Sequence, residues 1–201
     1  MTMKGFGVRV VTLLVTAALL AGVVPAHAQT RSTVIWETLQ SSNPQGYVLL
    51  IRHALAPGNG DPENFKLGDC STQRNLSKEG RKDAQDIGFW LKRQKVKISR
   101  VESSRWCRAN ETAQLLGIGK VRPNKNLDSL FTEADVMGHP QTAEIRKQIV
   151  GYRNKRGLLV LVGHFVNISA VTGVGLESGE GVVVRADKKG EIKVVGFTPI
   201  P

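Results

Sequence analysis

The chain has 201 residues, a net charge of +11 at neutral pH and only two cysteines. Its length suits a single domain with an adequate core. Its basic residues are scattered, with few aromatic residues between them, which disfavours a nucleic-acid partner; the charge favours an anionic one, such as a phosphorylated small molecule or an anionic envelope surface.

The first 28 residues have the pattern of a secretory signal peptide. A positively charged start precedes the apolar run 10–24, and Ala26-His27-Ala28 provides a cleavage site with small residues. An uncleaved membrane anchor is the alternative, but the run is short for a span of roughly 20 residues. We therefore expect a mature chain, residues 29–201, that is soluble and periplasmic or secreted. Without residues 1–28, which carry two basic residues and no acidic one, the net charge is +9.

Strands and helices alternate along the remaining chain. Apolar runs predict strands, and apolar residues at helical spacing predict helices. In chain order we predict a short helix (33–40), a strand (48–52), a long loop (56–75), a helix capped by Ser77 (to about 94), a strand (98–103), a helix (107–116), an extended piece near 121, an irregular segment (128–140), a helix (142–152), a strand (158–162), a short helix (165–171) and a hairpin (181–186 and 191–197). This order predicts a three-layer α/β/α fold with a mostly parallel central sheet and an antiparallel hairpin at its edge.

Two of the predicted strands end in a histidine. His53 follows "VLLIR" and His164 follows "LLVLVG". In open parallel sheets, ligands bind in the crevice beyond the carboxyl ends of the strands. A hydrogen-bonded loop residue is the plainer interpretation of one such histidine, but two in equivalent positions, with Arg52 beside the first, indicate a shared site.

Arg108 lies in the first turn of a predicted helix. Free backbone N–H groups and the helix dipole favour an anion there, so a cationic side chain needs a reason such as a bound anion. The alternative is a surface arginine that pairs with Glu111 one turn later.

The predicted site would hold the guanidinium groups of Arg52 and Arg108 and the imidazoles of His53 and His164. Such a set suits a phosphate. Guanidinium groups bind phosphate oxygens in a bidentate manner, and an imidazole whose tautomer is fixed can attack phosphorus. A proton donor for the leaving alcohol is still needed. The irregular segment offers Glu133 and Asp135, of which a partly buried carboxyl group could serve as the general acid; a solvated loop charge is the alternative for each.

Three motifs resemble those of the histidine phosphatase superfamily, the phosphoglycerate-mutase-like fold. They are "LIRHA", "SSRWCRANETA" and "LVGH". The family's usual motifs are Arg-His-Gly, then Ser-Ser-x-x-x-Arg-Ala-x-x-Thr-Ala, then a histidine after an apolar strand. Each motif alone is weak, but the three occur here in order from about Tyr47 to Gly173.

The resemblance implies a role for each matching position. His53 would be the nucleophile that becomes phosphohistidine. Arg52, Arg108 and His164 would bind the phosphoryl oxygens and stabilise the developing charge, with His164 also part of the catalytic set. The second motif points to Arg108 as the site arginine, with Arg105 peripheral. Glu133 is our first choice for the acid, and Asp135 the second.

The sequence departs from the family pattern at Ala54, which replaces the usual glycine. Alanine should fit there if its backbone angles are ordinary. The segment "LSKEGRKDA" resembles a family helix start in which Gly80 permits close packing. Arg74, on the long loop, and Asn167, after the third motif, are further candidates for substrate contacts.

Cys70 and Cys107 are both in the mature chain. In an oxidising compartment a disulfide between them is expected, with two free thiols as the alternative, and no spacing typical of a metal site accompanies them. In the fold implied by the resemblance both would lie near the site, where a disulfide could hold the long loop beside Arg108.

The sequence thus predicts an exported phosphomonoester hydrolase that forms a phosphohistidine without a metal or other cofactor. The substrate would be a sugar phosphate, another small monoester or a phosphate group of an envelope component. The alternative is a non-catalytic phosphate-binding or anion-binding protein of the same fold, which the unassigned acid keeps open.

Overall fold

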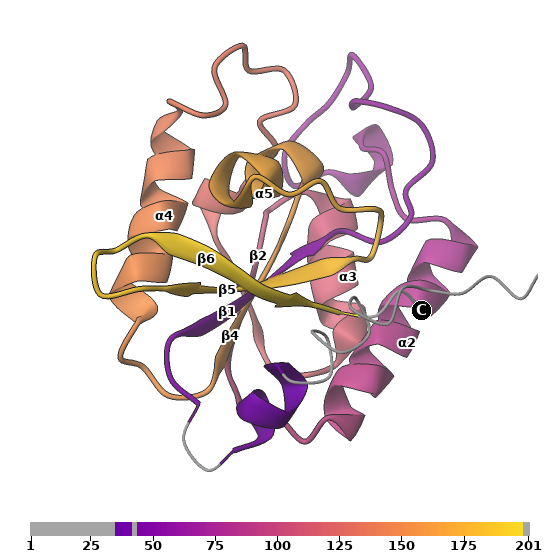
Figure 1. The fold of residues 1–201 in the computed structure, drawn as a ribbon. Coiled ribbons are helices and arrows are strands. Elements are labelled where there is room, and N and C mark those ends of the chain that lie inside the picture. The colour runs from indigo at the N-terminus through magenta and orange to yellow at the C-terminus, as the bar shows by residue number, and fades with distance from the viewer. Residues whose placement is uncertain (1–34, 42–43, 199–201) are drawn as a thin grey trace, which may run out of the picture.

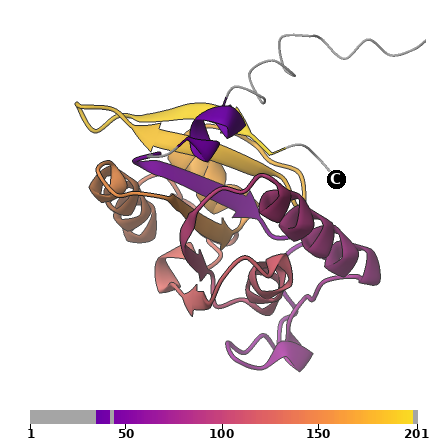
Figure 2. The same cartoon turned by 90° about the horizontal axis from the view of Figure 1, so that it is seen from below.

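The computed structural model describes residues 35–41 and 44–198, and a six-stranded sheet forms their centre (Figure 1). The predicted signal peptide lies outside these residues. The strands are β1 (Tyr47–Arg52), β2 (Ile98–Ser103), β3 (Val121–Pro123), β4 (Leu158–Gly163), β5 (Gly181–Ala186) and β6 (Ile192–Phe197). Their order is β3-β2-β4-β1-β5-β6; the first four are parallel, and β5 and β6 pair antiparallel. The predicted edge hairpin is confirmed, and it lies along the top of Figure 2.

Helices cover both faces of the sheet. They are α2 (Lys78–Arg93), α3 (Cys107–Leu116), α4 (Pro140–Tyr152) and α5 (Phe165–Thr172), with short 3-10 turns at η1 (Cys70–Thr72) and η2 (Lys125–Leu127). Residues 35–40 are also helical. Ser77 caps α2 as predicted, since its hydroxyl accepts from the Gly80 N–H at 2.9 Å. Helix α4 begins two residues before the predicted start, because His139 caps it through Nδ1 and Pro140 suits a first helical position.

The side chains of the strands form two separate cores. One core packs Leu49 and Ile51 of β1 against α2, α3 and the helical residues 35–40. The other packs Val48 and Leu50 against α4 and α5. Alternate residues of β1 therefore enter opposite cores, as the two-residue period of a strand requires. The three-layer α/β/α prediction is confirmed, with α4 on the opposite side of the sheet from α2 and α3 (Figure 1).

The carboxyl ends of the three central parallel strands are aligned. Arg52 of β1 is paired with Gly163 of β4, and Ser103 of β2 is paired with Val162 of β4. The segments that follow these strands therefore begin at one edge of the sheet, where α/β folds of this kind bind ligands. Among the described residues, no helix is long and apolar enough to span a membrane.

Gly80 allows α2 to pack closely on the segment after β1. A Cβ atom at Gly80 would lie 2.1 Å from the Leu55 carbonyl oxygen, which also accepts the Ser77 N–H at 3.0 Å. A side chain there would collide with the backbone. The close packing predicted from the sequence is therefore present.

Candidate active site

His53 is held directly beyond the end of β1. Its backbone N–H donates to the Gly163 carbonyl at 2.9 Å, which extends the pairing of β1 with β4 by one residue. Its side chain is buried, and Nδ1 lies 2.8 Å from the Ala54 carbonyl oxygen. Because a carbonyl can only accept, Nδ1 carries the hydrogen. The lone pair is therefore on Nε2, which is the nitrogen available for attack on an electrophile.

Ala54 fits the position where the family usually has glycine. It is fully buried, and its N–H donates to the Thr112 hydroxyl at 3.1 Å. Its φ angle is negative, so it needs none of the backbone freedom of glycine. Alanine at this position therefore leaves the geometry of His53 intact.

His164 follows β4 in the same way and faces His53, with the two ring centroids 5.4 Å apart. Its Nε2 lies 2.9 Å from Ser104 Oγ. Ser104 donates its single hydrogen to Asp128 Oδ1 at 3.3 Å, so it accepts the hydrogen bond from His164. This network places the hydrogen of His164 on Nε2 and leaves Nδ1 as the basic nitrogen.

Arg108 projects from the first turn of α3 into the same region. Only 2 % of it is exposed, and its Nη1 and Nη2 donate to the two oxygens of Asp61 at 2.5 and 3.2 Å. Asp61 also accepts from Trp106 Nε1 at 2.9 Å. The alternative pairing with Glu111 does not occur, because Glu111 binds Arg81. Arg105 is instead half-exposed and pairs with Asp128.

Arg52 approaches the site from the last position of β1. Its Nη1 donates to the Leu176 carbonyl at 2.8 Å, and its guanidinium lies over the ring of Phe165, 5.4 Å from the centroid. The Nε atoms of both Arg52 and Arg108 are buried and have no hydrogen-bond partner within the described part of the chain. Buried N–H donors normally have acceptors, so these two are exceptions, and both arginines also line the pocket that contains His53.

These groups line a pocket of about 290 Å³. Its lining consists of Arg52, His53, Gly58, Asn59, Gly60, Arg74, Arg108, Ser129, Phe131, His164, Phe165 and Val166. The four residues that the sequence predicts to surround a phosphate are thus brought together. Three arginines give the pocket a strongly positive character, which favours an anionic ligand.

Arg74 shapes the rim of this pocket. Its Nε donates to the Gly60 carbonyl at 2.8 Å, and its Nη1 donates to the carbonyls of Gly58 (2.8 Å) and Ala56. These bonds fold the loop after β1 around one guanidinium. Arg74 therefore lies at the pocket and also holds the loop that forms one wall, and its contact with a substrate stays a prediction.

Burial and positive charge keep both histidines neutral. Burial, opposed in part by the bond to Ala54 and reinforced by Arg108, Arg74 and Arg52, lowers the pKa of His53 to about 3. Burial also lowers the pKa of His164 well below its ordinary value, and His53 and the same arginines add to this effect. Burial alone would raise the pKa of Asp61, but the hydrogen bonds from Arg108 and Trp106 outweigh it and hold that pKa below its ordinary value. Asp61 is thus an ionised partner for Arg108.

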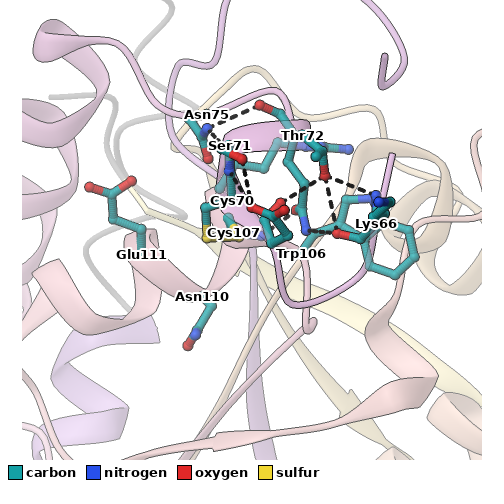
Figure 3. The surroundings of a disulfide bond; sticks show 12 residues. Lys66, Cys70, Ser71, Thr72, Asn75, Trp106, Cys107, Asn110 and Glu111 are labelled. Carbon is teal, nitrogen blue, oxygen red and sulfur yellow. Dashed lines mark hydrogen bonds between the residues drawn. A yellow bond between two sulfur atoms is a disulfide. The ribbon is translucent and has the colours of Figure 1, made fainter. Parts of the chain in front are cut away.

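A disulfide joins Cys70 of η1 to Cys107 at the start of α3, as predicted (Figure 3). The neighbouring Gln73 reinforces this junction, because its Oε1 accepts the Cys107 N–H at 2.9 Å and its Nε2 donates to the Lys66 carbonyl at 3.0 Å. The long loop is therefore attached to the helix that carries Arg108.

Three predicted site residues are not brought to the pocket. Glu133 is exposed on the segment after η2, and Asp135 is exposed and accepts the Gly138 N–H at 2.8 Å. Neither carboxylate lines the pocket. Asn167 is buried instead of facing a substrate, because its amide bonds the Leu130 N–H and the Asp128 carbonyl and so holds that segment in place.

Sequence reasoning missed two features of the site. Asp61 is in no motif, and only the need of buried Arg108 for a counter-charge could have pointed to it. Phe131 and Phe165 also line the pocket, and neither is in one of the three motifs. Among the described residues, no cluster of three or more histidine, cysteine or acidic side chains is arranged to hold a metal ion.

Solved structures of histidine phosphatases share this fold. The protein histidine phosphatase SixA, complexed with tungstate, matches with a TM-score of 0.56 at 19 % identity, over 76 % of this chain and 96 % of SixA. Phosphoserine phosphatase of Entamoeba histolytica, in complex with 3-phosphoglyceric acid, matches with a TM-score of 0.57 at 13 % identity, over 76 % of this chain and 96 % of its own. No model of a protein family and no curated protein sequence matches the chain. At such identities the likeness establishes the histidine phosphatase fold and nothing further.

Proposed function

We propose that the protein is a phosphomonoester hydrolase of the histidine phosphatase superfamily, with His53 as its nucleophile. One observation carries this proposal: the Nδ1–H of His53 is bonded to the Ala54 carbonyl, so the lone pair of Nε2 is available in a pocket lined by three arginines and a second histidine. The fold neighbour SixA, a protein histidine phosphatase complexed with the oxyanion tungstate, supports a phosphatase function.

The proposed reaction has two steps. In the first, Nε2 of His53 forms a bond to phosphorus, the bond between phosphorus and the ester oxygen breaks, and the ester oxygen takes up a proton as it leaves as the alcohol. In the second, water attacks the phosphorus of phosphohistidine and loses a proton, the P–N bond breaks, and inorganic phosphate and neutral His53 are released. Because Nδ1 keeps its hydrogen bond to Ala54 throughout, the backbone stabilises the charge that the imidazole acquires.

The arginines would stabilise the transferring phosphoryl group. Arg52 and Arg108 line the pocket, and their guanidinium groups would donate hydrogen bonds to the phosphoryl oxygens. A bound dianion also favours the protonated form of His164. We therefore propose that His164 takes up a proton on Nδ1 and donates it in a hydrogen bond to the phosphoryl group. This charge neutralisation comes from side chains, so the proposed route uses no metal.

Within the part of the chain that the structure describes, no carboxyl group that could donate a proton to the leaving group lines the pocket. Glu133 remains the residue predicted from the sequence, with Asp135 second. Because both carboxylates are exposed and outside the pocket lining, either residue would serve as acid only if its segment moved over the bound substrate.

We also propose that the protein acts outside the cytoplasm. The signal-peptide pattern of residues 1–28 supports export, and the Cys70–Cys107 disulfide suits an oxidising compartment. Phosphorylated components of the cell envelope are then natural candidates for the substrate, alongside small phosphomonoesters.

Release of phosphate from a general phosphomonoester tests the proposal. We expect the purified protein to hydrolyse it between pH 4 and 8, and His53→Ala to lower the rate by at least a hundredfold. If wild type and His53→Ala release phosphate equally slowly while wild type still binds inorganic phosphate, the alternative holds, and the protein is a non-catalytic anion-binding protein.

A further inference from the structure

Two phenylalanines form an apolar rim around the positive pocket. Phe131, after η2, is 57 % exposed, and Phe165, at the start of α5, is 44 % exposed. Both line the pocket that contains His53. Large exposed apolar side chains that lie beside a cavity are typical of a ligand-binding surface.

Neighbouring groups position both rings. A Cβ atom at Gly60 would lie 3.6 Å from Phe131 Cε1, so this ring contacts the loop that Arg74 holds. The ring of Phe165 is packed on the Arg52 guanidinium, and a Cβ atom at Gly175 would lie 3.3 Å from its Cε2. The two rings therefore come from different elements of the pocket lining, Phe131 from the segment after η2 and Phe165 from α5. Because these contacts already hold both rings, ordering them when a ligand binds between them would cost little affinity.

The polar lining of the pocket supports the same conclusion. The ionisable residues of the lining are three arginines and two histidines, and no aspartate or glutamate is among them. Loss of an alkyl alcohol from phosphorus benefits from a carboxylic acid that protonates the oxygen. A phenolic hydroxyl, with a pKa of about 10 as in tyrosine, leaves far more readily without such help. The pocket volume of about 290 Å³ is at the low end for small-molecule sites, which suits a phosphate and one ring.

We infer that the pocket selects phosphate esters of an aromatic hydroxyl group, with the phosphate on Arg52, Arg108 and His164 and the ring between Phe131 and Phe165. This inference rests on the proposed function and specifies its substrate class. The phenylalanines would determine specificity and take no part in the chemistry.

Binding of stable phosphonates tests the inference, because their P–C bond is not cleaved and the leaving group cannot affect the result. The probes are phenylphosphonate, methylphosphonate and inorganic phosphate, titrated calorimetrically into the wild-type protein. We expect phenylphosphonate to bind about tenfold more tightly than methylphosphonate, a difference of about 1.4 kcal/mol. Phe131→Ala and Phe165→Ala should each reduce this preference to threefold or less, and the double variant should abolish it.

Met137→Ala is the matched control. Met137 is 64 % exposed on the same segment as Phe131 but does not line the pocket, so its removal should leave the preference unchanged. Phe165→Leu keeps apolar packing on Arg52 and separates loss of the ring from disturbance of that arginine. Equal binding of the two phosphonates by the wild type, or a preference that survives in the double variant, overturns the inference and leaves the phosphatase proposal intact. Failure to bind any of the three probes would contradict the phosphatase proposal instead.

Discussion

At the scale of single residues, the protonation of His53 decides what the site can do. An imidazole that is neutral, with its hydrogen fixed on Nδ1, is ready to attack over a wide pH range, whereas an imidazolium is not. The bond to Ala54 fixes the tautomer, and burial among arginines lowers the pKa of His53 to about 3. The same burial has a consequence for stability.

Stability should fall in acid because of His53. The unfolded chain binds a proton at this histidine near pH 6.5 and the folded chain only near pH 3, so acid favours unfolding. The stabilising contribution is fully present above pH 6.5 and is lost as the pH falls towards 3. Each pH unit in this window should cost about 1.4 kcal/mol of the free energy of unfolding.

Chemical denaturation at pH 7 and pH 5 measures this effect, with His53→Gln as the comparison. The variant keeps a polar side chain of similar size but does not titrate, so its stability should fall less between the two pH values than that of the wild type. His164, which is also buried and neutral, keeps part of the pH dependence in both proteins. Identical losses in the two proteins would show that His53 is not held neutral by the fold.

The sequence predicted some site residues and not others for a physical reason. His53 and His164 each follow a strand directly, and Arg108 lies in the first turn of the helix after β2, so the order of strands and helices indicates that they share one edge of the sheet. Asp61 and Phe131 lie on irregular segments, and their positions depend on tertiary bonds such as that of Arg74 with Gly60. Glu133 was chosen for its place on such a segment, where the sequence does not determine which way a side chain faces.

At the scale of elements, the loop after β1 and helix α3 act as one unit. The disulfide joins them at Cys107, and the adjacent Arg108 is bound to Asp61 of the same loop. Arg74 draws the intervening carbonyls together. The loop wall of the pocket and its central arginine are therefore positioned by the same contacts.

The double variant Cys70→Ser/Cys107→Ser tests this coupling. Loss of the cross-link over 37 residues should lower the free energy of unfolding by about 3–4 kcal/mol, measured by denaturation in urea. Because the loosened loop also carries the pocket wall, kcat/KM for a phosphomonoester should fall at least fivefold. Wild type treated with dithiothreitol is the matched control and should behave like the variant, which itself should not respond. Unchanged stability and activity in the variant would show that the disulfide does not hold the loop in the position that the site needs.

Helices and strands could be predicted closely because their signals are local. The apolar runs predicted β1 and β4, and the Ser77 cap predicted the start of α2. The start of α4 was misplaced by two residues because the cap there is His139, a residue that is uncommon in this role. The shape of the loop after β1 depends on Arg74 and the disulfide, so no local pattern could predict it.

At the scale of the whole molecule, the fold converts distant segments into one site. Strand β1 lies between β4 and β5, which are more than 100 residues away in the chain, and this order brings His53 beside His164. The alternation of strands and helices predicts a parallel sheet, but it does not give the strand order. Solved structures of histidine phosphatases share the fold that results.

The central claim is that His53 becomes phosphorylated during turnover, and trapping the intermediate tests it most directly. The wild-type protein would be mixed with a ³²P-labelled aryl phosphate, quenched within milliseconds in alkali, and digested for mass spectrometry. We predict one labelled peptide containing His53, stable in alkali and lost in acid, and no label in His53→Ala. An acid-stable adduct on another residue, or rapid phosphate release without any adduct on His53, would contradict the account.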